Sequence, residues 1–429
     1  MSILKELQKL EEAEIISQET ANSIRNYYQT REGQSQSRLF VIFAIFGSIL
    51  IGLGIVLIIA HNWDELSRQT KTFIAFLPLL IGQGFCGFAL LKKQESVAWI
   101  ESSAAFLFFA VGTSISLVSQ TYQIPGNLSS FLLTWMLLCF PLIYIMKSAV
   151  VSMLYIVGIT VYACETCYFS FPTSESYIYW LLLLIAIPYY LLLHKNRPKS
   201  NFTTFHNWIV PVSVTIVLGS VANENSNLIY VAYVSLFGLF YLIGNSDFFK
   251  NYGLKSNGYL IIGSLGTVIL LLILSFDFIW KEMLTRNYHL DKALISPEFF
   301  ASLILSVLAG GLFYFRRKNK PLADFLPIEP VFVLFIIIFL FSLTSSTIPT
   351  ILINLLVFGI GILTIRIGAK RDHLGILNYG LLIVTALVVC RFFDEKISFV
   401  IRGILFVSVG IGFFATNYWI LKKRKTHEL

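Results

Sequence analysis

The chain contains many apolar runs that are each as long as a helix that crosses a lipid bilayer. The hydrocarbon core of a membrane is about 30 Å thick, and a helix that spans it needs roughly 20 mostly apolar residues. Fourteen windows meet this requirement, near residues 39–61, 71–91, 97–118, 129–146, 148–168, 176–194, 207–222, 228–244, 257–276, 298–315, 331–346, 350–366, 373–391 and 398–421. The pattern predicts an all-α fold, a polytopic integral membrane helix bundle of about fourteen transmembrane helices. The number falls to thirteen or twelve if the pairs that meet at Lys147 and at 345–350 are each one element.

The composition supports a membrane protein and argues against an ordinary soluble domain. The 429 residues are 56% hydrophobic and 13% charged, with a mean hydropathy of +0.75, whereas soluble domains are about 45–50% apolar and about 25% charged. The net charge of +8 does not require that the protein binds nucleic acid. Basic loops are instead attracted to anionic membrane lipids, by about 1 kcal/mol for each residue near the surface.

Lysine and arginine residues gather in alternate loops, and this predicts the orientation. Cytoplasmic loops of membrane proteins hold the excess of these residues. With the N-terminus inside and fourteen spans, 24 of the 32 basic residues fall on the inner side, seven on the outer side, and Arg402 within the last span. We therefore expect a multi-pass protein of the cell inner (plasma) membrane with both termini in the cytoplasm.

This map divides the chain into a helical hairpin at 1–36, a transmembrane domain at 37–421 and a basic tail at 422–429. The hairpin consists of two short amphipathic helices around a turn at 15–17, and Ser17 is expected to cap the second helix. About 30 residues cannot build a core of their own. The hairpin is therefore expected either to lie against the inner membrane face or to dock a protein partner or a second copy. No cleavable signal peptide is visible, because the first 38 residues are polar.

The sequence indicates no cofactor and no metal. No set of His and Cys residues has the spacing of a zinc site, and no GxxxxGK[ST] loop is present. Cys164 and Cys167 lie at the outer end of the fifth predicted helix, where they are either structural thiols or a disulfide.

Four stretches resemble a bacterial family of predicted membrane proteins known as domain of unknown function 2157. They are LxxxEIISQETANSIRNYY, GLGIVLIIAHNWDEL, SLVSQTYQIPGN and the closing RFFDEKISFVIRGILFVSVGIGFFATNYWILKKRK. The resemblance covers roughly the first 150 and the last 60 residues, and the combination of NWD with QTYQIPG carries it. It implies kinship and brings no reaction, substrate or cofactor.

Polar turns with aromatic residues are expected at the outer face, after the first, third and thirteenth helices. Two charges within predicted spans mark further candidates, because charged side chains at membrane depth are costly and face the bundle interior or water. The candidate substrate-binding residues are Asn62, Trp63, Asp64, Glu101, Gln120, Tyr122, Arg391, Asp394 and Arg402. Each of these residues also has an explanation without a binding role. Asn62 can cap a helix end and Trp63 can lie at the headgroup level. Arg391 and Asp394 can form an exposed ion pair, and Arg402 can extend to the membrane interface.

Small residues mark two further features. Glycines at 47, 52 and 54 and at 403, 410 and 412 predict close helix packing. Ser114, Ser116 and Ser119 align with Gly112 along the third helix and form a polar face of small side chains. This face is the best candidate in the sequence for a path or groove, and ordinary helix packing is its alternative.

Three functions remain open at this point. Many spans and short loops favour a transporter or a lipid-linked flippase-like protein, with membrane lipids and a lipid-linked or small polar ligand as its partners. A structural or sensory membrane partner protein would dock through residues 1–36. A polytopic transferase would act on a lipid-linked substrate at the outer face, with Asp64 and Glu65 as acid or base and with Arg391 and Arg402 holding a phosphate.

Overall fold

The structure is a computed structural model. It describes residues 66–169, 174–222, 226–285, 293–318 and 326–392, together with 10, 13, 15–24 and scattered positions within 42–57 and 398–414. The described residues are helical and include no strand, which confirms the all-α prediction. The chain divides into two compact units. Unit 1 is Met1–Glu165 with Ile178–Asn196, and unit 2 is Thr166–Tyr177 with Arg197–Leu429.

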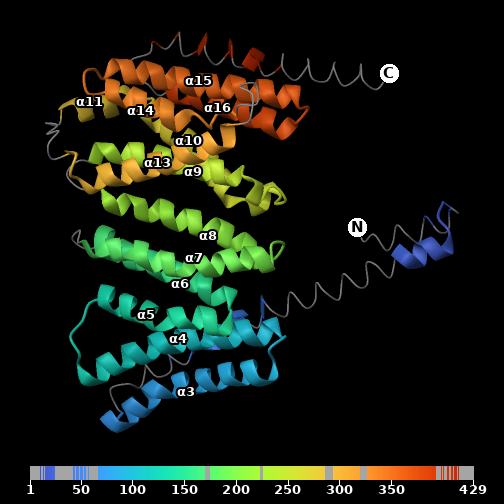
Figure 1. Ribbon diagram of the computed structural model, residues 1–429, viewed down its shortest axis with the longest axis vertical. Coiled ribbons are helices and arrows are strands. Elements are labelled where there is room, and N and C mark those ends of the chain that lie inside the picture. Colours follow the sequence, from blue (N-terminus) through green and yellow to red (C-terminus); the bar gives the residue numbers. More distant parts are fainter. Residues whose placement is uncertain are drawn as a thin grey trace. The chain divides into compact units, whose positions relative to one another are not determined.

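Within the described residues, unit 1 contains five long helices (Figure 1). They are α3 (Arg68–Lys92), α4 (Val97–Tyr122), α5 (Leu128–Met146), α6 (Ala149–Cys164) and α7 (Ile178–Asn196). Ser67, Asn127 and Ser148 cap α3, α5 and α6 with their side-chain oxygens, which satisfies backbone N–H groups that a helix start leaves open. Helix α4 packs against α3, α5 and α6 and is the central helix of the unit.

The α5–α6 junction shows that the apolar stretch around Lys147 forms two helices. Lys147 has the left-handed backbone that ends α5, with φ of 49°. The hydroxyl of Tyr189 on α7 donates to the carbonyl oxygen of Lys147 at 2.8 Å. The turn is therefore fixed by a hydrogen bond from a neighbouring helix.

Among the described residues, unit 2 contains eight continuous helices of nine or more residues. They are α8 (Asn201–Leu218), α9 (Ile229–Gly244), α10 (Gly258–Leu274), α11 (Asp277–Thr285), α13 (Pro297–Arg317), α14 (Val331–Phe341), α15 (Thr347–Lys370) and α16 (Leu374–Phe392). Short pieces of helix accompany them: the π-helix η2 (Glu165–Phe169), whose first residue belongs to unit 1, and the 3-10 helices η3 (Ser174–Tyr177), η4 (Gly219–Val221), η5 (Ser226–Leu228), η6 (Asp247–Phe249) and η7 (Leu254–Ser256). Helix α9 packs against α8, α10, α13 and α14, and its apolar core includes Trp280, Phe332 and Phe335, all buried.

A buried ion cluster ties helix ends together in unit 2. Glu329 precedes α14, and its carboxylate contacts Arg317 and lies 3.3 Å from Nη1 of Arg316. Arg316 also donates to the carbonyl oxygens of Leu242 and Asn245 at the end of α9. These carbonyls lack partners within their own helix, so the arginine completes the helix end while its charge is balanced by the acid.

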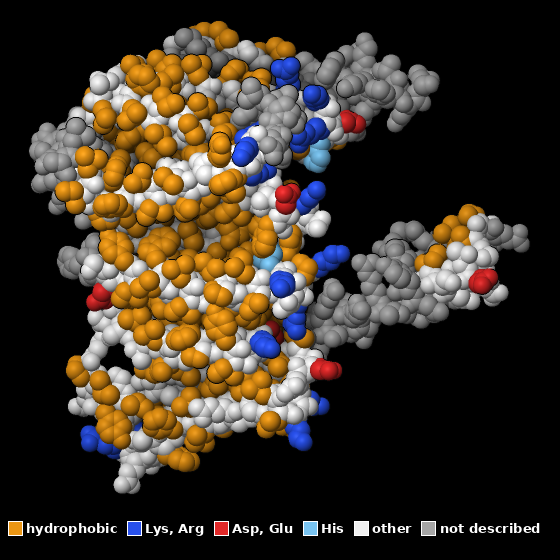
Figure 2. Space-filling view, viewed as in Figure 1, with side chains coloured by type: hydrophobic (Ala, Val, Ile, Leu, Met, Phe, Trp, Pro, Cys, Tyr) orange, Lys and Arg blue, Asp and Glu red, His pale blue; other side chains and the backbone are white. Residues whose placement is uncertain are grey.

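Basic side chains gather at one end of the helices in each unit (Figure 2). In unit 1 this basic end holds Lys92, Lys93, Lys147 and Lys195, whereas Arg68 and Lys71 lie at the other end, where α3 begins. In unit 2 the ends of α13 and α15 contribute Arg316, Arg317 and Lys370. The separation within each unit matches the alternation of basic loops in the sequence.

The predicted number of fourteen spans is not confirmed. Among the described residues, nine helices are long and apolar enough to cross a membrane, and a tenth span results if α10 and α11, bent by 72°, count together. The window at 331–346 contains only the 11 residues of α14, about 16 Å of helix at about 1.5 Å per residue. The residues that follow Phe341 form a turn, and a hydropathy window does not distinguish such a turn from helix. The windows at 39–61 and 398–421 lie largely outside the described residues.

Glycine packing occurs in helices other than those predicted. A Cβ on Gly47, Gly54, Gly403, Gly410 or Gly412 would meet no atom of the described residues within 4 Å. Gly52 and most residues of these two segments lie outside the described residues, so the predicted seams stay a prediction. Close contacts between helix backbones occur, for example, between α9 and α10 and between α15 and α16. There, a Cβ on Gly263 would lie 2.4 Å from the backbone nitrogen of Tyr241, and one on Gly380 would lie 2.6 Å from that of Ile365.

Two shorter predictions are confirmed. Ser17 accepts a hydrogen bond from the backbone nitrogen of Thr20 at 3.3 Å and begins a helix at 18–24. The mixed polar and apolar pattern at 277–297 also predicts a short helix, and α11 (Asp277–Thr285) occupies the first part of this segment.

The α9–α10 contact gives a first test. Gly263→Val should destabilise the protein by about 1–3 kcal/mol or more, because the new side chain meets backbone atoms that cannot move aside. Gly311→Val is the matched control, since Gly311 has no neighbouring atom within 4 Å. Thermal unfolding of the purified proteins in detergent should show a midpoint several degrees lower for the first variant only. Equal midpoints would contradict the packing described here.

Candidate functional site

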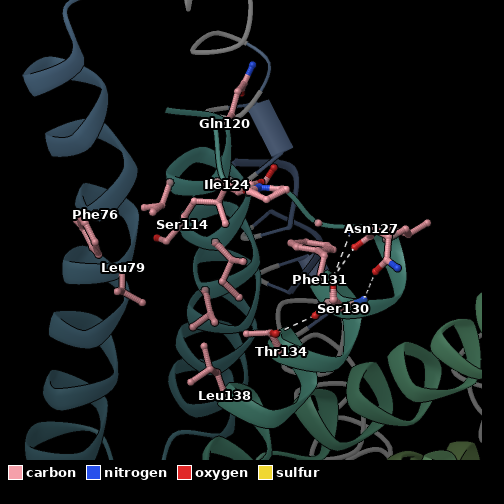
Figure 3. A pocket seen from close by; sticks show the side chains of 18 of the residues that line it. Phe76, Leu79, Ser114, Gln120, Ile124, Asn127, Ser130, Phe131, Thr134 and Leu138 are labelled. Carbon is pink, nitrogen blue, oxygen red and sulfur yellow. Dashed lines mark hydrogen bonds between the residues drawn. The ribbon is translucent and has the colours of Figure 1, made fainter. Parts of the chain in front are cut away.

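A groove of about 1310 Å³ lies between α3, α4 and α5 of unit 1 (Figure 3). It extends along α4 from Val111 to Gln123, roughly 18 Å of helix. Its lining is formed by Phe76, Leu79, Gln83, Val111, Ser114, Ile115, Ser116, Val118, Ser119, Gln120, Gln123, Ile124, Pro125, Gly126, Asn127, Leu128, Ser130, Phe131, Thr134 and Leu138. Every polar side chain among these residues is an uncharged hydroxyl or amide.

Polar side chains are densest at the turn between α4 and α5 and continue along the groove. Gln120, Gln123, Asn127 and Ser130 lie near the turn. Farther along, the lining includes Ser116 and Thr134, then Ser114, and finally Gln83 on α3 beside apolar residues such as Leu79, Val111 and Leu138. The groove therefore combines a polar mouth, polar groups at successive depths and apolar walls.

Most lining hydroxyls use their proton within the protein. Ser114 donates to the carbonyl oxygen of Ala75 at 2.7 Å, and Thr134 to that of Ser130 at 2.8 Å. Ser119 and Ser130 donate to the carbonyl oxygens of Ile124 and Asn127. A hydroxyl has one proton and two lone pairs, so these four side chains can offer a ligand acceptors but no donor; Ser130 keeps one lone pair, because it also accepts from the backbone nitrogen of Asn127.

The turn at the mouth of the groove has a defined conformation. Gln123 ends α4 with φ of 50°, and the backbone nitrogen of Ile124 donates to the carbonyl oxygen of Ser119 at 3.0 Å. Asn127 begins α5 with a capping box: its Oδ1 accepts from the backbone nitrogen of Ser130, whose hydroxyl accepts from the nitrogen of Asn127. Such paired bonds satisfy the open N–H groups of the helix start. The polar rim is thus held by backbone geometry.

Close contacts between α4 and its neighbours set the width of the groove. The bond from Ser114 to Ala75 ties α4 to α3 in the interior. The ring of Trp135 on α5 occupies the space beside Gly112, where a Cβ would lie 2.6 Å from the ring, and its Nε1 donates to the carbonyl oxygen of Phe108 at 2.8 Å. Gly112 therefore serves helix packing and does not line the groove.

Glu101 is buried in unit 1 at the basic end of α4, where it is 1% exposed. Its carboxylate accepts hydrogen bonds from the hydroxyl of Ser148 and, at 3.0 Å each, from the backbone nitrogens of Ala149 and Val150. A carboxylate at this place completes the first turn of α6 and interacts favourably with the positive end of the helix dipole. The side chain points into the bundle toward another helix, as predicted, and its contacts are those of a structural clamp.

Gln120 and Tyr122, the other described candidates of unit 1, contact different surroundings. Gln120 lines the groove. Tyr122 contacts the start of α3 instead, where its hydroxyl lies 3.0 Å from Oγ1 of Thr72 and the guanidinium of Arg68 lies 5.8 Å from its ring centre. Both residues belong to the last turn of α4, not to a loop as expected. Residues two apart on a helix face different directions, and this separates them.

Arg391 lies in unit 2, at the break between α10 and α11. It donates to the hydroxyl of Ser275 at 2.9 Å, and its guanidinium lies 4.5 Å from the ring centre of Phe276. Asn354 donates to the carbonyl oxygen of Ser275. The arginine thus supports the helix break.

The remaining candidate residues lie outside the described residues. They are Asn62, Trp63, Asp64, Asp394 and Arg402. The predicted meeting of NWD with Gln120 and Tyr122 therefore stays a prediction.

Three polar lining residues were missed by sequence reasoning. Gln83 is a lone amide in the apolar stretch LLIGQGF, and a polar residue within a span is the signal that could have identified it. Ser130 and Thr134 stand four residues apart on α5 and therefore share a face. The sequence indicated the polar face of α4, but it did not indicate the polar residues of α3 and α5 that lie opposite this face.

Redox and metal chemistry gain no support in the described part of the chain. Cys164 and Cys167 are not joined by a disulfide. No group of three or more His, Cys, Asp or Glu residues in the described ranges is placed to hold a metal ion.

The all-helical fold, the apolar spans and the separated basic ends define a multi-span α-helical membrane protein. Residues 8–152 match the family described as Predicted membrane protein (DUF2157). The predicted resemblance is thus confirmed over a segment that contains α3, α4 and α5, and for the last 60 residues it stays a prediction. No curated protein and no solved structure matches the chain.

The clamp at Glu101 gives a second test. Glu101→Ala should lower the free energy of unfolding by about 3 kcal/mol, because two buried backbone N–H groups and a hydroxyl lose a charged acceptor. Glu101→Gln should lower the free energy of unfolding by less, because its amide oxygen still accepts a hydrogen bond. Glu95→Ala, in the exposed α3–α4 turn, is the control. Unfolding in detergent followed by tryptophan fluorescence measures the differences, and a Glu101→Ala protein as stable as the control would contradict the clamp.

Proposed function

We propose that the protein is a transporter of the lipid flippase-like kind, and that the groove between α3, α4 and α5 holds the headgroup of a lipid or lipid-linked molecule. The proposal rests on the residues that line this groove and on how polar and apolar side chains are distributed among them. A polar mouth suits a headgroup, and the apolar walls that include Leu79, Val111 and Leu138 suit the upper part of an acyl or prenyl chain.

The depth of the polar lining favours movement over simple anchoring. A lipid anchored at the membrane surface needs hydrogen bonds only at the headgroup level. Here the hydroxyls of Ser116, Thr134 and Ser114 and the amide of Gln83 continue the polar surface away from the mouth. A headgroup that moves along the groove would exchange one partner for the next, which lowers the cost of leaving water.

The two other functions have less support from the described residues. The transferase proposal relied on Asp64, Arg391 and Arg402; two of these lie outside the described residues, and Arg391 supports a helix break. A docking role for residues 1–36 rests on the short helix at 18–24. A lipid-binding groove accounts for more of the observed geometry.

A tryptophan pair tests the proposed function. Leu138 lines the groove and is 58% exposed, whereas the adjacent Leu137 is 45% exposed and does not line it. Leu138→Trp should fill the groove and slow the transfer of fluorescent short-chain lipids across proteoliposomes by tenfold or more, while Leu137→Trp should leave it unchanged. Dithionite quenching measures the transfer for a panel of headgroups. If no lipid moves faster than in protein-free vesicles, the proposal fails.

We further propose that the mouth of the groove faces the outside of the cell, because the basic ends of the helices belong on the cytoplasmic side. Ser129 lies at the mouth, and Lys199 follows α7 among basic residues. In a variant that lacks the five native cysteines, Ser129→Cys should react with a membrane-impermeant thiol reagent added to intact cells, and Lys199→Cys should react only after lysis. The reverse pattern would overturn the orientation.

A further inference from the structure

We infer that the headgroup recognised by the groove is an uncharged polyol, such as the sugar of a glycolipid. This inference rests on the proposed lipid-binding function and specifies its substrate class. It follows from the charge of the lining and from the hydrogen bonds that its hydroxyls already make.

The charge of the lining is the first argument. All twenty residues of the described part of the chain that line the groove are uncharged types. A phosphate or an ammonium group brought into a partly apolar groove loses hydration, and this loss is large unless an opposite charge compensates it. A neutral headgroup loses less and needs only hydrogen bonds.

The direction of hydrogen bonding is the second argument. Ser114, Ser119, Ser130 and Thr134 each donate their proton to a backbone carbonyl oxygen, at distances from 2.7 to 3.1 Å. They therefore present lone pairs to the groove. A ligand that matches these acceptors must bring donors, and a phosphate, which has only acceptor oxygens when ionised, does not.

Amide side chains complete the match. Gln83, Gln120 and Gln123 each carry two N–H donors and one acceptor, and all three line the groove. The hydroxyls of a sugar both donate and accept. A polyol can therefore use the fixed acceptors and the amide donors together, whereas a phosphate can use only the donors.

Native mass spectrometry of the full chain in detergent tests this inference with three lipids that share the same dioleoyl chains. The probes are monoglucosyl dioleoylglycerol, dioleoyl phosphatidic acid and dioleoylglycerol. We expect the glucosyl lipid to bind at least tenfold more tightly than dioleoylglycerol, and phosphatidic acid to gain no advantage over dioleoylglycerol. Binding of the glucosyl lipid should also be lost in Leu138→Trp and kept in Leu137→Trp.

A matched pair of threonines isolates the headgroup contacts. Thr134→Val removes one acceptor from the groove and keeps the side-chain shape. Thr385→Val removes a hydroxyl that likewise donates to the carbonyl four residues earlier, but Thr385 lies on α16 in unit 2. The first variant should weaken binding of the glucosyl lipid by roughly three- to tenfold, the effect of one hydrogen bond, and leave dioleoylglycerol unchanged. The second should alter neither.

The outcomes separate the two proposals. If all three lipids bind equally and Leu138→Trp abolishes them all, the groove binds lipid and the polyol inference is wrong. If phosphatidic acid binds best, the inference is likewise overturned and an anionic headgroup takes its place. If no lipid binds, or if a photo-crosslinker at Ser116 captures residues 39–61 of the same chain in place of lipid, both the inference and the proposed function fail.

Discussion

The position of α4 in unit 1 depends on the carboxylate of Glu101. The first turn of a helix leaves backbone N–H groups without partners, and within a membrane no water replaces them. Glu101 supplies the acceptor for the start of α6 from a different helix, so α4 and α6 cannot separate without exposing a buried charge and open N–H groups. At the other end of α4, Ser114 bonds to α3 and the α4–α5 turn is held by the Asn127 capping box. These contacts together determine the width of the groove and the direction of its polar side chains.

The groove differs from an ordinary helix seam in what fills the space between helices. Where this protein packs helices closely, glycine lets backbones approach, as Gly263 does beside Tyr241 and Gly380 beside Ile365. Between α3, α4 and α5 a space of about 1310 Å³ remains, and its lining includes hydroxyls and amides beside apolar side chains. Lipid tails are as apolar as leucine, so such polar side chains gain nothing from facing them. These side chains can form hydrogen bonds when a polar molecule occupies the groove.

Much of the fold could be predicted from the sequence, because apolar length and loop charge are local properties. Helices occupy all twelve predicted windows that fall in the described residues, and Glu101 points inward. The exact number of spans could not be predicted, since hydropathy does not register the turn that shortens α14 or the bend at Ser275. For the site, the serine face of α4 was identified, while Gln83 and Thr134 were not, because single residues on neighbouring helices acquire a common role only when packing brings them together. The sequence placed Gln120 and Tyr122 in a turn after the helix, whereas both lie in the last turn of α4, where they face different directions.

The central claim is that an amphiphile occupies the groove, and the most direct measurement is an experimental density map of the full chain in nanodiscs made with lipids of its own membrane. The account predicts an elongated density between α3, α4 and α5, with a bulky head beside Gln120 and Asn127 and a tail along Leu138. Density for residues 39–61 filling the groove, or a headgroup located at the basic end of unit 1, would contradict it.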